Sequence, residues 1–224
     1  DRQDFDIFAS MRPAKEVGGD FYDYFFIDQD KLAVVIADVS GKGIPAALFM
    51  MITKTLLKNM ALSNSNLSDV FIKANHSLCE NNDAGMFVTA FLAVLDLKNG
   101  NLAYINAGHS SPLIQRDGGN FEWLPVKPNF VLAGMDHVQY TAQETTLAKG
   151  DTLFLYTDGV IEAFNKKLQL YGEDRLRDHL NNQAVGSSLQ AADIVESVKQ
   201  SVDSFAQGAE QADDITVLCL KYLG

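Results

Sequence analysis

Residues 37–47 read ADVSGKGIPAA, and the rest of the sequence is best interpreted outward from them. An apolar run leads into Asp38, and Pro45 then suits the first turn of a helix over 44–58. Asp38 is therefore predicted at the end of a strand, before a loop with a glycine on either side of Lys42. A carboxylate in that position is held rigidly and stays open to a ligand.

Short apolar and β-branched runs, separated by turn residues, predict a mainly antiparallel β protein. Residues 21–27 and 32–37 predict one hairpin. Residues 98–101, KNGN, predict the turn of a second, because an Asn-Gly pair readily takes left-handed backbone angles. The strands expected elsewhere are 87–95, 102–107, 112–115, 121–124, 140–147, 152–156 and 215–221.

Helical spacing of apolar residues predicts two pairs of helices. The helix over 44–58 shows little polar surface and is expected to be well buried. The next one is expected to begin with Ser68 as its N-cap and to end at 81–82, and the late pair covers 174–182 and 189–205. Many antiparallel strands with helices inserted early and late predict a β-sandwich with helices packed outside it.

Composition narrows the function classes. The chain has 224 residues, of which 47% are hydrophobic, enough for the core of one domain. A net charge of -11 disfavours nucleic acid, and no apolar stretch reaches the roughly 20 residues of a membrane span. Cys79 and Cys219 lie far apart in apolar patterns, which indicates reduced, buried thiols and a cytoplasmic location. Because the chain starts at Asp1 without methionine, we expect a longer parent protein.

Asp20, Asp38, Asp158 and the pair Asp213 and Asp214 share a setting beside glycine or against an apolar strand. Each alone has a structural explanation as a turn residue, a helix cap or a strand entry. Together they form the pattern that brings acids from distant positions to one edge of a sandwich. Oxygen-rich sites of this kind suit Mg²⁺ or Mn²⁺ rather than zinc or copper, and the mutual repulsion of the carboxylates requires cations or protons.

Five ordered motifs carry a resemblance over essentially the whole chain. They are PAKEVGGDFYD (13–23), ADVSGKGIPAAL (37–48), MFVTAFLAVLDLKNGNLAYINAGHSSPL (86–113), LYTDGVIEA (155–163) and ADDITVL (212–218). This set resembles the SpoIIE-type bacterial branch of the PPM family, the metal-dependent type 2C serine/threonine phosphatases. The resemblance implies an α+β fold over 1–224, a four-layer αββα sandwich of two mainly antiparallel sheets flanked by helices, with two Mn²⁺ or Mg²⁺ ions.

The resemblance also assigns metal ligands. Asp38 matches the family's bridging aspartate, the Val39 carbonyl matches the backbone oxygen that follows it, and Asp20 matches the acid on the second metal. In such enzymes a water between the metals attacks the phosphorus of phosphoserine or phosphothreonine in line. The cations lower the pKa of that water and neutralise charge on the phosphoryl oxygens.

The remaining ligands of the first metal match Asp158 and Asp213, with Asp214 in the adjacent position. The neighbouring acids leave open which of the two coordinates. Together with Asp20 and Asp38, Asp158 and Asp213 are the expected catalytic residues. No covalent intermediate on the enzyme is required.

Departures from the eukaryotic pattern concern the general acid and the phosphate contact. Ser40 stands where those enzymes have a histidine, so the group that protonates the leaving alkoxide is unassigned. His109 belongs to the SpoIIE-type pattern, as a site-supporting or a structural histidine. Lys15 falls roughly where a phosphate-binding arginine is expected, and a surface lysine is its alternative. Lys42 lacks the spacing of a nucleotide-binding P-loop.

The leading hypothesis is a metal-dependent phosphoprotein phosphatase of bacterial signalling. By resemblance, its substrate is a phosphorylated STAS-type anti-sigma-factor antagonist, and an upstream regulatory region of the same chain controls it. The helix over 44–58 begins directly after the loop that follows Asp38, so a shift of that helix would reposition Asp38. A homodimer is compatible with this scheme. The alternatives are a non-catalytic phosphatase-fold adaptor that binds a partner protein and a cation-binding structural domain.

Overall fold

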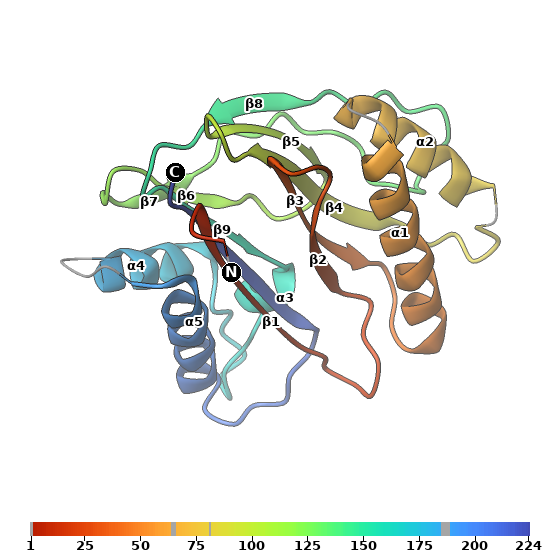
Figure 1. Ribbon diagram of the computed structural model, residues 1–224. Coiled ribbons are helices and arrows are strands. Elements are labelled where there is room, and N and C mark those ends of the chain that lie inside the picture. Colours follow the sequence, from red (N-terminus) through yellow and green to blue (C-terminus); the bar gives the residue numbers. More distant parts are fainter. Residues whose placement is uncertain (1, 64–65, 81, 185–188) are drawn as a thin grey trace. The chain divides into compact units, whose positions relative to one another are not determined.

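The computed structural model describes residues 2–63, 66–80, 82–184 and 189–224, and they form two compact units (Figure 1). Unit 1 comprises Asp1–Ala14, Ser110–Leu124 and Leu147–Gly224. Unit 2 comprises Lys15–His109 and Pro125–Thr146. Each unit has one antiparallel five-stranded sheet with its own helices, which confirms the expected α+β class.

Unit 2 contains both predicted hairpins. Its strand order is β2-β3-β4-β5-β8, and every neighbouring pair is antiparallel. Two helices follow β3 along the chain and cover one face of this sheet. The elements are β2 (Phe21–Phe26), β3 (Lys31–Val39), α1 (Ile44–Ser63), α2 (Leu67–Cys79), β4 (Val88–Asp96), β5 (Asn101–Ala107) and β8 (Gln143–Thr146).

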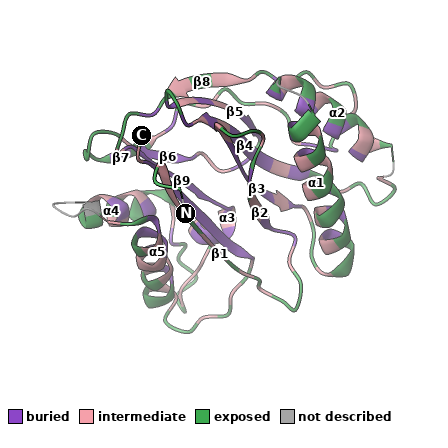
Figure 2. Cartoon of the chain, in the orientation of Figure 1, coloured by how far each residue is buried: buried purple, intermediate pink, exposed green. Residues whose placement is uncertain are grey.

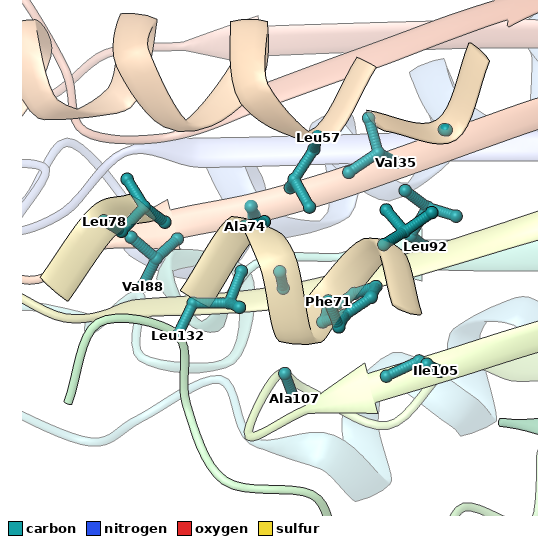
Figure 3. Close-up of a cluster of buried hydrophobic side chains, with 14 of the residues drawn as sticks. Val35, Leu57, Phe71, Ala74, Leu78, Val88, Leu92, Ile105, Ala107 and Leu132 are labelled. Carbon is teal, nitrogen blue, oxygen red and sulfur yellow. The ribbon is translucent and has the colours of Figure 1, made fainter. Parts of the chain in front are cut away.

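The core of unit 2 lies between its sheet and the helices α1 and α2. Side chains of β3 alternate between two faces, so Val35 and Val39 face the helices on one side of the strand. Figure 3 shows Val35 beside Leu57 of α1, with Phe71 of α2 in the same cluster. All four side chains are at most 2% exposed, so this packing holds β3, and with it Asp38, in a fixed position.

Unit 1 is built on the strand order β1-β10-β9-β6-β7. The first strand was not expected from the sequence, and it pairs along its whole length with the last one. Helix α5 packs Val195, Val198 and Val202 into the core of this unit. The elements are β1 (Phe5–Arg12), β6 (Leu113–Gln115), β7 (Phe121–Trp123), β9 (Thr152–Tyr156), α3 (Asp158–Ile161), α4 (Glu173–Ala184), α5 (Ala191–Ala206) and β10 (Ile215–Tyr222).

The expectation that α1 is well buried was wrong. One side of the helix enters the core, but Ile44, Leu48, Met51 and Ile52 on the other side are 53–69% exposed. Figure 2 shows exposed stretches along the helix. The apolar residues of α1 lie on all sides of the helix, but the sheet can cover only one of those sides.

The ends of α2 also differ from the prediction. Asn66 is the N-cap, because its Oδ1 accepts hydrogen bonds from the backbone N–H groups of Ser68 (2.8 Å) and Asp69 (3.4 Å). Ser68 therefore lies inside the first turn. The helix ends at Cys79; of the two residues expected to break it, Asn82 lies beyond that end and residue 81 lies outside the described residues.

Two expectations from composition concern the thiols and the membrane. Cys79 and Cys219 are both free cysteines; Cys219 is buried as expected, whereas Cys79 is only half-buried. Burial raises the pKa of each thiol, most strongly for the completely buried Cys219, so neither is a ready nucleophile. Among the helices that the structure describes, none combines the length and the apolar character needed to cross a membrane.

Candidate metal centre

Asp38 is the next-to-last residue of β3 and lies directly opposite Thr89 of β4. Its neighbours Ala37 and Val39 face the helices of unit 2, so the alternation of side chains directs Asp38 to the other face of the sheet. Strands β2 and β4 hold β3 on both edges. The carboxylate is half-buried and therefore combines a rigid backbone with access from solvent.

Asp20 reaches the same corner of unit 2 from the start of β2. Phe21 pairs with Ala37, and the antiparallel register brings Asp20 next to Asp38. Gly19 permits this approach, because a Cβ at that position would lie 2.8 Å from the carbonyl oxygen of Val39. The side chain of Asp20 is only 2% exposed. Unit 2 thus brings together two predicted carboxylate ligands and the predicted carbonyl ligand.

Ser40 extends the pairing of β3 and β4 by one residue. Its backbone N–H donates to the carbonyl of Phe87 at 2.8 Å, and its Oγ accepts the N–H of Phe87, also at 2.8 Å. The residue therefore holds the chain at the start of the Gly41–Gly43 loop, where both glycines adopt positive φ angles of 94° and 78°. This gives Ser40 a structural role, and the general acid stays unassigned.

His109 is buried and belongs to the same unit. Its Nδ1 lies 2.9 Å from the Oγ1 of Thr89, the residue opposite Asp38. The side chain of Asn106 accepts the backbone N–H of His109 at 2.8 Å and donates to its carbonyl at 3.0 Å. His109 is thus in contact with Thr89, the residue that pairs with Asp38. We did not predict Thr89 from the sequence. The signal that reveals Thr89 is the strand register.

The two lysines considered for phosphate binding are both exposed. Lys15 lies in the segment between β1 and β2, and Lys42 lies between the two left-handed glycines of its loop. Their exposure is that of surface lysines. The carboxylates are therefore the better-defined part of the site in unit 2.

Unit 1 carries the other predicted ligands on two adjoining segments. Asp158 opens the short helix α3, and Asp213 and Asp214 immediately precede β10. Gly159 permits the contact between the segments, because a Cβ there would lie 1.9 Å from the carbonyl oxygen of Asp214. Thr157 ties them further: its N–H donates to the carbonyl of Thr216 at 3.0 Å, and its Oγ1 accepts the N–H of Thr216 at 3.1 Å.

The neighbouring acids Asp213 and Asp214 have different surroundings. Oδ1 of Asp214 accepts the backbone N–H of Ala14 at 2.7 Å, and Asp214 is only 7% exposed. Oδ1 of Asp213 accepts the N–H of Asp214 at 2.9 Å, and the side chain is half-buried. Asp214 is thus tied to a distant segment, whereas this hydrogen bond of Asp213 is local.

Asp213 also lines a cavity of about 370 Å³ within unit 1. Arg12 stands at this cavity, with a salt bridge to Asp203 (2.8 Å) and a hydrogen bond to Gln211 (2.7 Å). Gln211 in turn donates to the carbonyl of Asp213 at 2.8 Å. A guanidinium and a predicted ligand therefore line the same cavity. No motif in the sequence marks Arg12, because its partners lie about 200 residues away.

The donor atoms of the predicted ligands in unit 1 and in unit 2 are all oxygen. A carboxylate as deeply buried as that of Asp20 requires a compensating cation or hydrogen bonds, because desolvation disfavours its charged form. Carboxylates and a backbone carbonyl are the ligands that Mg²⁺ and Mn²⁺ prefer. The residues present in each unit therefore fit the expected ions.

Comparison with known sequences finds a matching family and two longer relatives. The family described as Stage II sporulation protein E (SpoIIE) matches residues 28–223. The phosphoserine phosphatase RsbU of Bacillus subtilis is 32% identical over 96% of this chain. Protein IcfG of Synechocystis is 30% identical over 98% of it. The chain spans 63% of the length of RsbU and 38% of that of IcfG.

Solved structures show the same fold. The SiaA-PP2C domain of Pseudomonas aeruginosa matches 96% of this chain and 85% of its own, with a TM-score of 0.84 at 23% identity. The PP2C phosphatase domain of SpoIIE from Bacillus subtilis, solved with a fragment of its regulatory domain, matches 97% of this chain and 63% of its own, with a TM-score of 0.81 at 18% identity. The chain therefore has the α+β fold of PP2C domains.

Proposed function

Because this chain belongs to the SpoIIE family, we propose that it is a metal-dependent protein phosphatase that hydrolyses phosphoserine or phosphothreonine. The observation that best supports this function is how closely each unit packs the backbone around its predicted aspartate ligands. In each unit a glycine without room for a side chain, Gly19 or Gly159, brings two segments into backbone contact beside the aspartates. Such contacts position ligands more tightly than a surface acidic cluster would.

We assign the ligands as the family resemblance implies. Asp20, Asp38 and the Val39 carbonyl would hold metal in unit 2, and Asp158 and Asp213 would hold metal in unit 1. RsbX has been solved with magnesium and the catalytic domain of PstP with two manganese ions, which supports Mg²⁺ or Mn²⁺ for this chain. When bound, the ions would supply a nucleophilic water near neutral pH and would neutralise phosphoryl charge.

The residues of the chain have distinct tasks in this reaction. The aspartates set the position of the attacking oxygen relative to the phosphorus, because their backbones are fixed by strands and by glycine contacts. Thr89 and His109 keep the face of the sheet around Asp38 in place through their hydrogen bond. The half-buried Asp38 leaves the site open to a phosphorylated side chain of another protein.

The proposed substrate is a phosphorylated STAS-type antagonist of an anti-sigma factor, in the cytoplasm of a bacterium. Two relatives from Bacillus subtilis, RsbU and RsbP, are named phosphoserine phosphatases, which supports the phosphoserine part of this proposal. These relatives are longer than the chain. We therefore propose that residues 1–224 form one phosphatase domain, controlled by a regulatory region of the same protein.

The test is a phosphatase assay with p-nitrophenyl phosphate and with a phosphoserine protein. We expect turnover with Mn²⁺ or Mg²⁺ and its loss with EDTA, because the carboxylates alone cannot activate water. Calorimetric titration with Mn²⁺ accompanies the assay. Metal-independent turnover would contradict the mechanism, and a folded chain that binds no metal would instead favour a phosphatase-fold adaptor.

Replacing Asp213 by asparagine is expected to cost much more activity than the same change at Asp214. Asp214 already accepts the N–H of Ala14, and an asparagine oxygen can accept the same bond, so this neutral variant keeps the contact. Asp213→Asn removes a charge that we assign to the first ion. The measurement is kcat at saturating Mn²⁺ together with the Mn²⁺ concentration for half-maximal activity; the reverse order of effects would make Asp214 the ligand.

A further inference from the structure

A second group of metal-ligating side chains lies in unit 2, apart from the predicted ligands. It joins His76 of α2 to Asp136 and His137 of the loop that follows the bridge residue Leu132. Nδ1 of His76 is 3.1 Å from Oδ1 of Asp136, and Nε2 of His137 is 3.5 Å from Oδ2 of the same carboxylate. The three possible ligand atoms all lie within 4.8 Å of one another. Two of the chain's four histidines thus meet at one carboxylate.

A buried asparagine fixes the two segments that carry this group. Asn75 precedes His76 and is only 1% exposed. Its Oδ1 accepts the N–H of Ala133 at 2.8 Å, and its Nδ2 donates to the carbonyl of Met135 at 2.9 Å. Asn75 forms hydrogen bonds with backbone groups on both sides of residue 134. If the loop moved away from α2, those backbone groups would lose their hydrogen bonds. The approach of Asp136 to His76 is therefore built into the fold.

The loop backbone also orients the third side chain. His137 has a positive φ of 58°, which residues with a Cβ adopt infrequently. Its N–H donates to Oδ1 of Asp136 at 2.7 Å, and its ring stacks on that of His76 with centroids 6.0 Å apart. Both imidazoles consequently lie beside one carboxylate, and neither is covered: the side chains of His76 and His137 are 52% and 86% exposed.

The chemistry of this group differs from that of the predicted catalytic ligands. Two imidazoles with one carboxylate suit zinc, nickel, cobalt or copper, whereas a set made only of oxygen atoms suits Mg²⁺ or Mn²⁺. The hydrogen bond from His76 to Asp136 raises the pKa of the imidazole, so a proton competes with a metal for the same nitrogen. A metal requires the neutral ring, so its binding displaces that proton.

We propose that His76, Asp136 and His137 bind one divalent transition-metal ion of the zinc and nickel class. Ligand atoms around such an ion are roughly 3.3 Å apart at tetrahedral bond lengths, so the exposed rings need to draw in by only about 1–2 Å. Glu80 provides a further carboxylate one helical turn after His76, with its Oε1 3.7 Å from Nε2 of that ring. The bound ion would cross-link α2 to the loop.

The test is calorimetric titration with Ni²⁺ in the presence of excess Mg²⁺, which occupies oxygen-ligand sites. We expect one equivalent of Ni²⁺ to bind to the wild type and its affinity to fall at least tenfold in His76→Gln and in His137→Gln. Both side chains are exposed, so the variants should retain the circular dichroism and melting temperature of the ion-free wild type. Ni²⁺ should raise the melting temperature of the wild type and not of these variants.

The matched control is His179→Gln, since His179 lies in unit 1 and contacts Ser197 at 3.3 Å. We expect this variant to bind Ni²⁺ as the wild type does, and Asp38→Asn to do the same, which separates this site from the proposed phosphatase centre. No Ni²⁺ binding to the wild type, or equal affinity in all variants, would overturn the proposal. In either case the His76 and Asp136 contact would be an ion pair only.

Discussion

Replacing Asp38 by asparagine is expected to reduce metal-dependent phosphatase turnover at least about a thousand-fold. Asparagine keeps the shape of the side chain but removes a charge that the proposed metal centre requires. Several kcal/mol of transition-state stabilisation depend on ions in such centres, and each ~1.4 kcal/mol corresponds to a tenfold change in rate. The backbone of β3 cannot shift to make up for the lost ligand, because β2 and β4 hold this strand on both edges.

The stability of this variant distinguishes a lost ligand from a misfolded protein. Asp38 and Asp20 approach the same corner of unit 2, so their charges repel each other without a cation. The metal-free Asp38→Asn protein should therefore melt at the same temperature as the metal-free wild type or above it. Mn²⁺ should raise the melting temperature of the wild type much more than that of the variant.

A control with the same change of charge is Asp83→Asn, at an exposed turn residue of unit 2. We expect wild-type turnover and wild-type metal dependence from it. Undiminished turnover of Asp38→Asn, measured with p-nitrophenyl phosphate at saturating Mn²⁺, would remove Asp38 from the centre. A lower melting temperature without metal would point to a structural role for the carboxylate.

Gly159→Ala is expected to destabilise unit 1 and to weaken Mn²⁺ binding together. The added Cβ would lie 1.9 Å from the carbonyl oxygen of Asp214 and 2.9 Å from its carbonyl carbon. These are backbone atoms at the entry to β10, and they cannot rotate away as the end of a side chain can. The segment of Asp158 must therefore separate from that of Asp213, at a cost of about 1–3 kcal/mol or more for overpacking.

The measurement is a denaturation curve together with calorimetric titration with Mn²⁺. We expect a lower midpoint and, at temperatures where the variant is folded, a weaker affinity for Mn²⁺. Gly119→Ala is the matched control, because its Cβ would approach the carbonyl of Arg116 at 3.0 Å in an exposed turn that can adjust. Wild-type stability and affinity in Gly159→Ala would show that this contact does not position the ligands.

The individual strands and the family followed from the sequence because they depend on short-range patterns. Apolar and β-branched runs predicted the hairpin of β2 and β3, and the Asn-Gly pair predicted that of β4 and β5; both hairpins are confirmed. Even there the detail of the turn differs, since Gly100 has a positive φ of 73° and Asn99 does not. The five motifs in order predicted the SpoIIE family, which the match over residues 28–223 confirms.

Other features required the tertiary structure, because they depend on residues far apart in the chain. Strand β1 exists through its pairing with β10 at the opposite end of the sequence, and we did not predict it from the sequence. The exposed side of α1 follows from which of its faces the sheet covers.

The same division holds for the candidate site. The sequence by itself determined which aspartates stand at strand ends and beside glycines, because residue type and short spacing are written in it. Only the folded chain decided that Gly159 touches the backbone of Asp214, that Thr89 links His109 to the strand of Asp38, and that His76 meets Asp136, 60 residues away. Such contacts arise when packing and strand register bring distant backbones together, and a linear pattern carries no signal for them.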